Sequence, residues 1–526
     1  MTRPKDIPVW KDIGVAAPPA AGAVETARIV IVGGGPVGMA MALDLGQRGH
    51  DIVLLTRWDF IPAYSKAICW SKRSLDILDR LGVGQRLVDK GVVWNVGKVF
   101  RGDSKAPVYE FDMQPVKNQK RPAFINLQQY HVEEQLYDAL AALPNVEFRS
   151  GHEVVGLTQE SSRVTVDVDC RGVGYRIAAD WLIACDGNRS TVRDLMGLDF
   201  DGRIFEDNFL IADIAMRGER PSERWFWFDP PFNKGQSALL HKQPDDMWRI
   251  DFQIGWNVDR EAATRDDNVE PRIRAMLGED VEFQKEWYSV YTFQCRRMAR
   301  FLHGRVVFAG DSAHLVSPFG ARGCNGGFAD IDNLGWKLDL VLRGEAPESL
   351  LESYNDEAVV TADENILNST RSTDFLTPKS AVSEAFRDAA LSLAADYDFA
   401  RPFVNSGRLS TAVAYPDSAL NTPDEERWSG GVGPGGPPLD APVGDGWLLD
   451  RLGGAFILLA NGAAAGAAGV KVIDISAHAG VEVLIERYEL SPGSAYLFRP
   501  DQYVAARWRR PTPEKISAAV KRAKGM

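Results

Sequence analysis

The feature that most constrains this chain is a glycine-rich segment, Gly33 to Gly38, between a predicted strand and a predicted helix. Residues 28–32 before it are mostly β-branched, and residues 39–48 after it are apolar along one helical face. A second strand is predicted at 52–55. In such a unit the glycines allow a tight turn and a close approach to a pyrophosphate at the helix N-terminus. A lone glycine loop is common, but both flanking elements are present, so the segment predicts a dinucleotide site.

Composition excludes several other classes of protein. A chain of 526 residues is expected to form more than one domain, and its net charge of −12 disfavours nucleic acid and anionic membranes as partners. The five cysteines are scattered without a CxxC or a zinc-ligand spacing, so we expect reduced thiols in a cytoplasmic protein and no metal site. No stretch reaches the ~20 apolar residues that a membrane span needs, and the first residues lack an apolar signal segment.

A change of pattern marks a second kind of domain. Between residues 203 and 301 the residue pattern is typical of a sheet, and in 248–254 apolar and polar residues alternate strictly. Such alternation is typical of a strand with one buried face and one face exposed to water. From Val306 onward the residue pattern again predicts helices alternating with strands. We therefore expect a sheet domain that is inserted into a discontinuous nucleotide domain. A loop rich in Gly and Pro at 429–442 precedes strand-like segments that predict a small C-terminal α/β module.

Two further motifs follow predicted strands. Residues 185–193, CDGNRSTVR, follow the strand 181–184, and by themselves they are typical of an ordinary turn. Residues 306–314, VVFAGDSAH, continue through PFGARGCNGG at 318–327 into an amphipathic helix. A strand that ends in a carboxylate and a glycine loop that opens a helix suit a ribose-type hydroxyl and a negatively charged ring edge.

Together, the three motifs in this order and spacing resemble the single-component (class A) FAD-dependent aromatic hydroxylases, such as para-hydroxybenzoate hydroxylase and phenol hydroxylase. The resemblance covers about residues 27–370. The tail around 495–505 resembles the thioredoxin-like C-terminal domain of the phenol-hydroxylase branch, without a CxxC and hence without a thiol redox role. The implied fold is α/β (α+β overall), with a discontinuous FAD-binding Rossmann-like domain, an inserted antiparallel sheet domain for the substrate and this C-terminal domain.

The expected boundaries follow from the motifs and from the changes of texture. They are an N-terminal extension at 1–26, the FAD-binding domain at 27–90, 123–203 and 301–370, the substrate sheet at 91–122 and 204–300, a helical connection at 371–400 and the C-terminal domain at 401–526.

The resemblance also implies site residues. The implied cofactor-binding residues are Gly33, Gly35, Pro36, Gly38, Lys66, Gln129, Asp186, Arg193, Asp311, Gly320, Gly323, Cys324 and Asn325. Among them, the first glycines would hold the FAD pyrophosphate, Asp311 the ribityl chain, and the amides of Cys324 and Asn325 the N1–O2 edge of the flavin. Asp186 and Arg193 belong to a motif that the family links to both FAD and the pyridine nucleotide.

The implied catalytic residues are Arg249, which matches a family arginine over the flavin, Pro318 beside the ring, and Tyr291 as a candidate lining residue. Two positions depart from the family pattern. Thr56 stands where an acid should bind the adenosine ribose, and Lys66 stands where many members have arginine. A lysine can offset phosphate charge but cannot make the bidentate contact of arginine.

The implied reaction is hydroxylation of a phenolic ring. NADPH or NADH reduces FAD, dioxygen adds at the flavin C4a, and the resulting hydroperoxide transfers an oxygen to the ring. Expected partners are therefore a small aromatic substrate and dioxygen, with the choice between monomer and homodimer left open.

Alternative functions remain open from the sequence. Residues 225–230, WFWFDP, approach the WxWxIP motif of flavin-dependent halogenases, although an aromatic strand that packs a core explains them as well. A flavin-dependent reductase or dehydrogenase without oxygen transfer, and a nucleotide sensor, are further alternatives. Several other side chains on the predicted sheet could line a pocket or form its core, namely Trp225, Trp227, His241, Tyr288 and Phe293. His314 is interpreted as structural rather than as a base.

Overall fold

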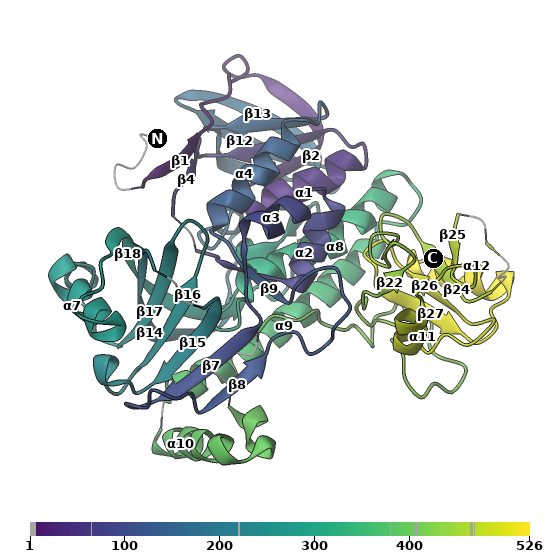
Figure 1. Cartoon of the computed structure of the whole chain (residues 1–526). Helices are drawn as coiled ribbons and strands as arrows, with labels where there is room; N and C mark the ends of the chain where they lie inside the picture. Colours follow the sequence, from purple (N-terminus) through teal and green to yellow (C-terminus); the bar gives the residue numbers. More distant parts are fainter. Residues whose placement is uncertain are drawn as a thin grey trace.

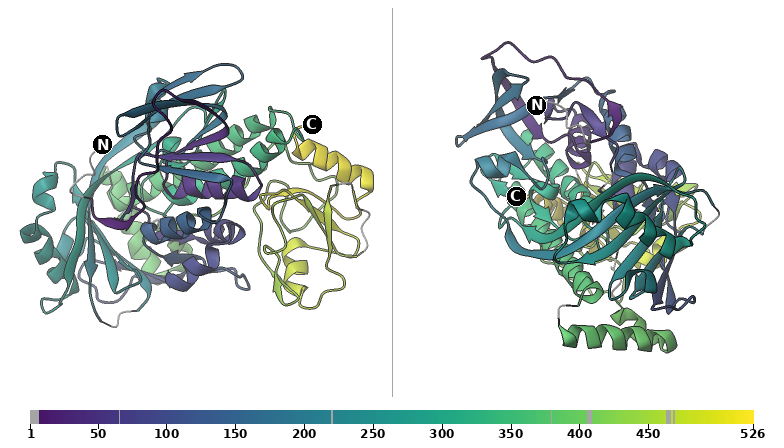
Figure 2. Two further views of the ribbon diagram at one scale, coloured as in Figure 1. Left: turned by 90° about the horizontal axis from the view of Figure 1, so that it is seen from above. Right: turned by 90° about the vertical axis from the view of Figure 1, so that its left-hand side faces the viewer.

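The structure is a computed structural model that describes residues 7–64, 66–218, 221–378, 380–404, 409–462, 466–467 and 469–526, with the backbone alone at 203–207. Figure 1 shows three parts: a central α/β part with β2, β13, α1 and α8, a large twisted sheet on one side, and a C-terminal part on the other. The left view in Figure 2 keeps the C-terminal part apart from the large sheet, so the central part separates the two.

The helix predicted after the glycine turn is present as α1, and the other helices surround the sheets. The helices are α1 (Pro36–Gln47), α2 (Lys72–Arg80), α3 (Gly84–Lys90), α4 (Gln129–Leu140), α5 (Thr191–Leu195), α6 (Arg260–Ala263), α7 (Asp266–Leu277), α8 (Gly323–Leu342), α9 (Leu350–Leu376), α10 (Ala381–Asp396), α11 (Glu482–Tyr488) and α12 (Pro513–Ala523), with 3-10 turns at Pro231–Asn233, Gly310–Ser312 and Asp398–Phe403. The helix predicted from Phe328 begins five residues earlier, at Gly323, because the glycine loop itself forms the first turn.

In the central sheet, the strands that directly precede the three cofactor motifs run parallel to one another. Its strands, in spatial order, are β10 (Val146–Ser150), β3 (Ile52–Thr56), β2 (Val24–Val32), β13 (Val173–Ala184), β12 (Val164–Cys170) and β11 (Glu153–Gln159), with β20 (Val306–Phe308) paired to β13 and to β19 (Leu302–His303). β2, β13 and β20 run parallel, so the three motifs emerge at the same edge. Their apolar strand ends and α1, α4 and α8 form one continuous core. This edge is where open α/β sheets bind ligands.

The second sheet is the inserted one. Its order is β21 (His314–Leu315), β18 (Gln284–Arg297), β14 (Asp201–Ala215), β17 (Met247–Gly255), β16 (Ser237–Lys242), β15 (Glu223–Phe228), β7 (Val96–Arg101) and β8 (Tyr109–Asp112). One face packs under α7 and carries a large apolar cluster. The other face packs toward the loop at Phe319 and toward α9 and α10. We call these the outer face and the inner face.

The C-terminal part has a four-stranded sheet in the order β25 (Lys471–Asp474), β24 (Ile457–Ala460), β26 (Ala495–Phe498) and β27 (Val504–Trp508). β24 pairs parallel with β25 and antiparallel with β26. One face of this sheet packs against Trp336 and Leu340 of α8. A helix that begins in the central site therefore ends against the C-terminal part.

The smaller strands complete the structure. They are β1 (Val9–Asp12), β4 (Phe60–Pro62), β5 (Cys69–Ser71), β6 (Val92–Val93), β9 (Phe124–Asn126), β22 (Pro442–Val443) and β23 (Gly446–Trp447). The expected mixed α/β fold class is confirmed, whereas the exact domain boundaries stay a prediction. The predicted extension at 1–26 differs in detail, because β1 pairs with β4 and β2 already begins at Val24.

Candidate flavin and substrate site

The glycine turn between β2 and α1 is shaped by close backbone contacts. Gly33 has a φ of +117°, and a Cβ there would lie 2.2 Å from the carbonyl oxygen of Cys185. A Cβ on Gly38 would lie 1.9 Å from the carbonyl oxygen of Gly33, so both positions require glycine. A Cβ on Gly35 would meet no atom within 4 Å among the described residues, and Pro36 starts α1 directly after it. The open side of the turn therefore lies at a helix N-terminus, which suits a pyrophosphate.

Thr56, which stands at the position expected to bind the adenosine ribose, is already in contact with neighbouring residues. Thr56 ends β3, and its Cβ would lie 2.7 Å from a Cβ added to Gly34. Its hydroxyl oxygen accepts a hydrogen bond from the N–H of Trp58 at 3.3 Å. The side chain thus packs against the glycine turn and offers at most one neutral hydrogen bond to a ribose.

The motif at 185–193 joins two of the strand ends. The Oδ2 of Asp186 accepts from the N–H of Val192 at 3.1 Å, while its Oδ1 is buried without a partner in the described part of the chain. Burial raises the pKa of Asp186. The buried Arg193 donates to the carbonyl of Ser312 at 3.1 Å and to that of Asn188 at 3.0 Å. Arg193 therefore fixes the turn at 310–312 against this motif.

Asp311 lies in that turn, directly after β20. Only burial and the charges of Lys66, His314 and Asp330 act on its carboxylate, without a hydrogen bond from any residue that the structure describes. Burial raises the pKa of Asp311, and the Lys66 charge acts in the opposite direction. A carboxylate short of donors at the end of a parallel strand suits the hydroxyls of a ribityl chain.

His314 has a different role from Asp311. Its Nε2 lies 2.6 Å from the Oδ2 of Asp330, which also accepts from the N–H of Gly310 at 2.8 Å. Burial lowers the pKa of His314, but Asp330 outweighs burial and holds this pKa above its usual value. The histidine is almost fully enclosed, in line with its structural interpretation.

The N-terminus of α8 forms the next wall. The amides of Gly323, Cys324 and Asn325 have no acceptor among the described residues. The side chain of Asn325 is occupied, because it accepts from the N–H of Ser71 at 3.0 Å and donates to the carbonyl of Cys69 at 3.0 Å. Three free amides at the positive end of a 20-residue helix suit a negatively charged ring edge.

The loop before α8 brings its backbone close to this end. Gly320 has a φ of +94°, which favours glycine, and its carbonyl accepts from the N–H of Ser410 at 2.8 Å. Pro318 is exposed, whereas Phe319 is buried and packs edge-on against Phe209 and Phe293 of the inner face. Pro318 thus lies at the surface where the central part meets the inserted sheet.

Gln129 fixes the loop that carries Lys66. Its Oε1 accepts from the N–H of Ala67 at 3.1 Å, and its Nε2 donates to the Oε1 of Glu133 at 2.9 Å. Burial raises the pKa of Glu133 to about 7, which Gln129 and Lys66 oppose. Lys66 itself is exposed, and its charge influences both Glu133 and Asp311.

The inner face of the inserted sheet supplies Arg249 and Tyr291. The Arg249 guanidinium is buried and pairs with Asp213 through two bonds, at 2.8 and 2.7 Å, and also donates to the carbonyl of Lys66 at 3.3 Å. Burial raises the pKa of Tyr291, and the charge of Asp311 raises it further. The structure therefore brings Arg249, Tyr291, Lys66 and Asp311 together.

The aromatic motif at 225–230 points away from this place. Trp225 and Trp227 pack in the outer-face cluster with Phe232, and Tyr288 lies in the same cluster. The alternate positions Phe226 and Phe228 face inward. The tryptophans of the halogenase-like motif therefore line the core under α7, which leaves the halogenase alternative with less support.

Sequence reasoning missed several polar residues on the inner face, namely Arg224, Asp213 and Asp251. The available signal was strand parity, because Arg224 and Asp251 share a face with Arg249 when the strands are aligned. Four successive aromatic residues follow Arg224, so the sequence shows no alternation from which the direction of its side chain could be predicted.

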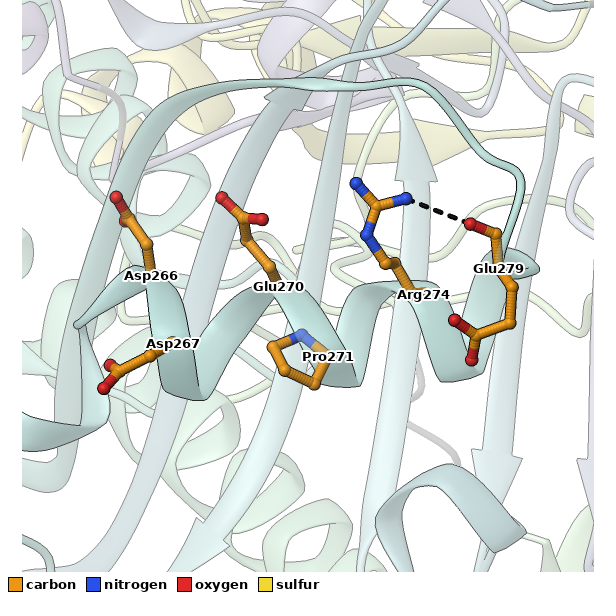
Figure 3. Close-up of a pocket in the computed structure, with 6 residues that line it drawn as sticks. All are labelled: Asp266, Asp267, Glu270, Pro271, Arg274 and Glu279. Atoms are coloured by element: carbon orange, nitrogen blue, oxygen red, sulfur yellow. Dashed lines mark hydrogen bonds between the residues drawn. The ribbon is translucent and has the colours of Figure 1, made fainter.

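Other features carry no site. A hollow of about 390 Å³ on α7 is lined by Asp266, Asp267, Glu270, Pro271, Arg274 and Glu279. Figure 3 shows Arg274 bonded to the carbonyl of Glu279, at the end of the helix that covers the outer face of the sheet. Within the described ranges no group of acidic, His or Cys side chains could hold a metal ion, and no helix is long and apolar enough to cross a membrane.

The geometry agrees with comparisons of the chain with known proteins. A probable NADH-specific resorcinol 4-hydroxylase of Rhodococcus jostii is 32% identical over 356 residues, which cover 65% of this chain and 64% of that protein. A 3-(3-hydroxy-phenyl)propionate/3-hydroxycinnamic acid hydroxylase of Escherichia coli is 28% identical over 338 residues, which cover 63% of this chain and 59% of that protein. The chain thus matches less than two thirds of the length of these relatives.

Solved structures show the same fold. The flavin-dependent monooxygenase PieE, solved with FAD and substrate, superposes with a TM-score of 0.77 at 23% identity, covering 94% of this chain and 99% of that one. The p-nitrophenol 4-monooxygenase PnpA of Pseudomonas putida gives a TM-score of 0.64 at 25% identity, covering 73% and 100%. The sequence profile of the FAD binding domain matches residues 26–369, so the chain belongs to that family, and its cofactor is FAD.

Proposed function

We propose that this protein is a monooxygenase that hydroxylates a phenolic ring with NADH or NADPH and dioxygen. The observation that carries the proposal is the position of the inner face. A polar row that contains Arg249 and Asp213 contacts the loop at Lys66, whose charge acts on Asp311 of the flavin turn. The relatives named above, which act on phenols, also support the proposal.

The residues present fit FAD. The open turn at Gly35 suits its pyrophosphate, the carboxylate of Asp311 its hydroxyl chain, and the amides of Cys324 and Asn325 the negatively charged edge of its ring. When bound, FAD supplies the redox chemistry with the nicotinamide and with dioxygen. Arg193 and Gln129 then act by holding the two flavin loops in position.

The inserted sheet would position the substrate and exclude water. Phe209, Phe293 and Phe319 pack against one another at the contact between the two parts and leave an apolar wall. Arg249 is held rigidly by Asp213, so its charge is fixed in direction beside the flavin loop. A dry, preorganised site of this kind strengthens electrostatic interactions and prevents loss of reactive oxygen species to water.

The test is a screen of phenols with the purified, FAD-loaded protein. Resorcinol, 3-(3-hydroxyphenyl)propionate and 4-nitrophenol are the first probes, because they represent neutral, carboxylated and acidic phenols. We expect one of the probes to stimulate NADH or NADPH oxidation and to yield a product that is heavier by one oxygen atom. Oxidation without a product would favour a reductase, and a halide-dependent product would favour a halogenase.

Localisation and assembly are proposals of the same kind. All five cysteines are free thiols, which supports a reducing compartment such as the cytoplasm. Size-exclusion chromatography with light scattering would decide between a monomer and a homodimer.

A further inference from the structure

Three neighbouring strands of the inserted sheet place a row of charged and polar residues on the inner face. Arg224 on β15 is the direct partner of His241 on β16, which is the direct partner of Arg249 on β17. Asp213 on β14 continues the row beyond Arg249. Directly opposed residues have Cβ atoms about 5 Å apart and share one face. Arg249 is the arginine that contacts the flavin loop. His241 is therefore one strand away from it, and Arg224 is two strands away.

The two halves of the row differ in their bonding. Arg249 and Asp213 satisfy each other with two bonds. Arg224 and His241 are each only 3% exposed, yet the Nε and Nη1 of Arg224 and the Nδ1 of His241 are buried without a partner among the described residues. Buried polar atoms without partners are uncommon in proteins and call for an explanation.

Asp251 determines which nitrogen of His241 is open. Its Oδ2 lies 3.3 Å from the Nε2 of His241, and a carboxylate oxygen accepts hydrogen bonds. The Nε2 of the neutral ring therefore carries the proton, which leaves Nδ1 with a lone pair. His241 thus offers a hydrogen-bond acceptor beside Arg224, which offers only donors.

The surroundings connect this pair to the flavin end of the site. Cys69 on β5 lies near enough to Arg224 and Arg249 for their charges to lower its pKa, although burial raises it more. Its carbonyl accepts from the side chain of Asn325 at the start of α8. Cys69 therefore lies near the cluster and is hydrogen-bonded to the helix end proposed for the flavin ring. The rings of Phe226 and Trp94 pack against Arg224, with the ring centroid of Phe226 4.6 Å from its guanidinium carbon.

We propose that His241 is the base that removes the proton from the hydroxyl of the phenolic substrate and that Arg224 binds the resulting phenolate. The O–H bond of the substrate breaks, the proton forms a bond to Nδ1 of His241, and the electron pair stays on the oxygen beside the Arg224 guanidinium. Asp251 then stabilises the imidazolium through Nε2. No electrons are transferred in this step. The phenolate that it yields is the form of the ring that is activated for attack by an electrophilic oxygen, so this proposal rests on the proposed function.

The charges around His241 suit a base that is neutral near pH 7. Burial lowers the pKa of His241, Arg224 on β15 and Arg249 on β17 lower it further, and Asp251 opposes them. Cys69 faces Arg224 from β5, and it is buried with a raised pKa.

The test compares two phenols of different acidity with the FAD-loaded enzyme. Resorcinol needs a base at pH 7, whereas 4-nitrophenol ionises near neutral pH without one. We expect His241→Gln to lower kcat/KM for resorcinol at pH 7 by about 100-fold or more, the usual effect of a lost general base. The loss should shrink to a few-fold for 4-nitrophenol at pH 8 and for resorcinol at high pH. FAD content and melting temperature should stay unchanged.

Variants of Arg224 test the second role. Arg224→Met should impair turnover of both phenols, because neither phenolate keeps its partner, and Arg224→Lys should recover part of the loss. The matched control is Lys242→Gln, which removes one positive charge from the next residue of β16, where the side chain lies over Trp248 of the outer face. It should leave both phenols unaffected.

Several outcomes would overturn the proposal. Equal losses for resorcinol and 4-nitrophenol in His241→Gln would show a structural role. A loss in Arg224→Met that is confined to 3-(3-hydroxyphenyl)propionate would place a carboxylate, not the phenolate, on Arg224. A wild-type enzyme that consumes NADH or NADPH equally with and without phenols would instead refute the proposed function itself.

Discussion

Two buried clusters of charges in this protein look alike in composition and differ in bonding. At the junction with the C-terminal part, Arg499 binds Glu357 at 2.7 and 2.9 Å and Asp501 at 3.0 Å, and Lys337 binds Glu357 at 2.8 Å. None of these four residues has a buried polar side-chain atom without a partner. On the inner face of the inserted sheet, Arg224 and His241 are similarly enclosed, Asp251 beside them is half-buried, and each of the three has such atoms.

The difference indicates what each cluster is for. A complete network of charges fixes a structure, because removal of one member leaves an uncompensated buried charge. An incomplete network in the same protein is a place where a ligand can complete the bonding. The junction cluster thus attaches the C-terminal part to α8 and α9, whereas the inner-face cluster is where we propose that a substrate oxygen completes the bonding.

The largest expected effect comes from breaking the complete cluster. Glu357→Gln should destabilise the protein by about 3–5 kcal/mol, because Arg499 and Lys337 lose the carboxylate that pairs them. Unfolding in urea, followed by tryptophan fluorescence, measures the change. A loss below 1 kcal/mol would show that the junction does not depend on these charges.

Glu133 is a buried carboxylate whose hydrogen-bond partner, Gln129, is neutral, so its negative charge should lower the stability of the protein rather than raise it. Burial raises the pKa of Glu133 from 4.5 to about 7, so the folded state holds a proton that the unfolded state releases. The stability that this proton gives is complete below pH 4.5 and is lost as the pH rises through 7, which amounts to about 3 kcal/mol. Glu133→Gln should therefore be more stable than wild type at pH 8 and equal to it near pH 4. The same gap at both pH values would contradict the raised pKa.

The flavin turn provides an intermediate case. Asp311→Ala should weaken FAD binding by about 2 kcal/mol, or roughly thirtyfold, because charge-assisted bonds to hydroxyls are lost. Thr56→Ala should change FAD affinity by only a few-fold, because its hydroxyl is engaged by Trp58. Fluorescence titration of the stripped protein with FAD measures both constants. Equal losses in the two variants would remove the ribityl role from Asp311.

The smallest effect is expected where the incomplete cluster is altered. Arg224→Met should change the free energy of unfolding by no more than about 1 kcal/mol in either direction, because the guanidinium has no hydrogen bond in the described structure to lose and its rings remain. The same urea experiment applies. A loss as large as that of Glu357→Gln would erase the distinction between the clusters.

The sequence predicted the parts of the site that depend on neighbouring residues. The turn at Gly33 and the loop before α8 could be predicted because short motifs determine backbone shape locally. The inner-face cluster could not, because it needs the register between β15, β16 and β17, which only the folded sheet provides. The junction of Arg499 with Glu357 joins residues 142 positions apart and left no local pattern.

The burial of each face of a strand is also difficult to predict from the sequence. Alternation at 248–254 predicted a two-faced strand and placed Arg249 on its polar face, and β17 has this arrangement. The polar face is in fact buried against the central part rather than exposed to water, since Arg249 is only 4% exposed. Alternation indicates two faces, but it does not indicate which one meets another part of the chain.

The central claim is that this FAD protein transfers oxygen to a phenol. The most direct measurement is turnover with NADH or NADPH under ¹⁸O₂, with mass spectrometry of the product of the best phenol in the screen. The account predicts one ¹⁸O atom in each product molecule and none in a parallel reaction with ¹⁶O₂ in H₂¹⁸O. Product oxygen derived from water, or consumption of the nicotinamide with hydrogen peroxide as the sole oxygen product, would contradict it.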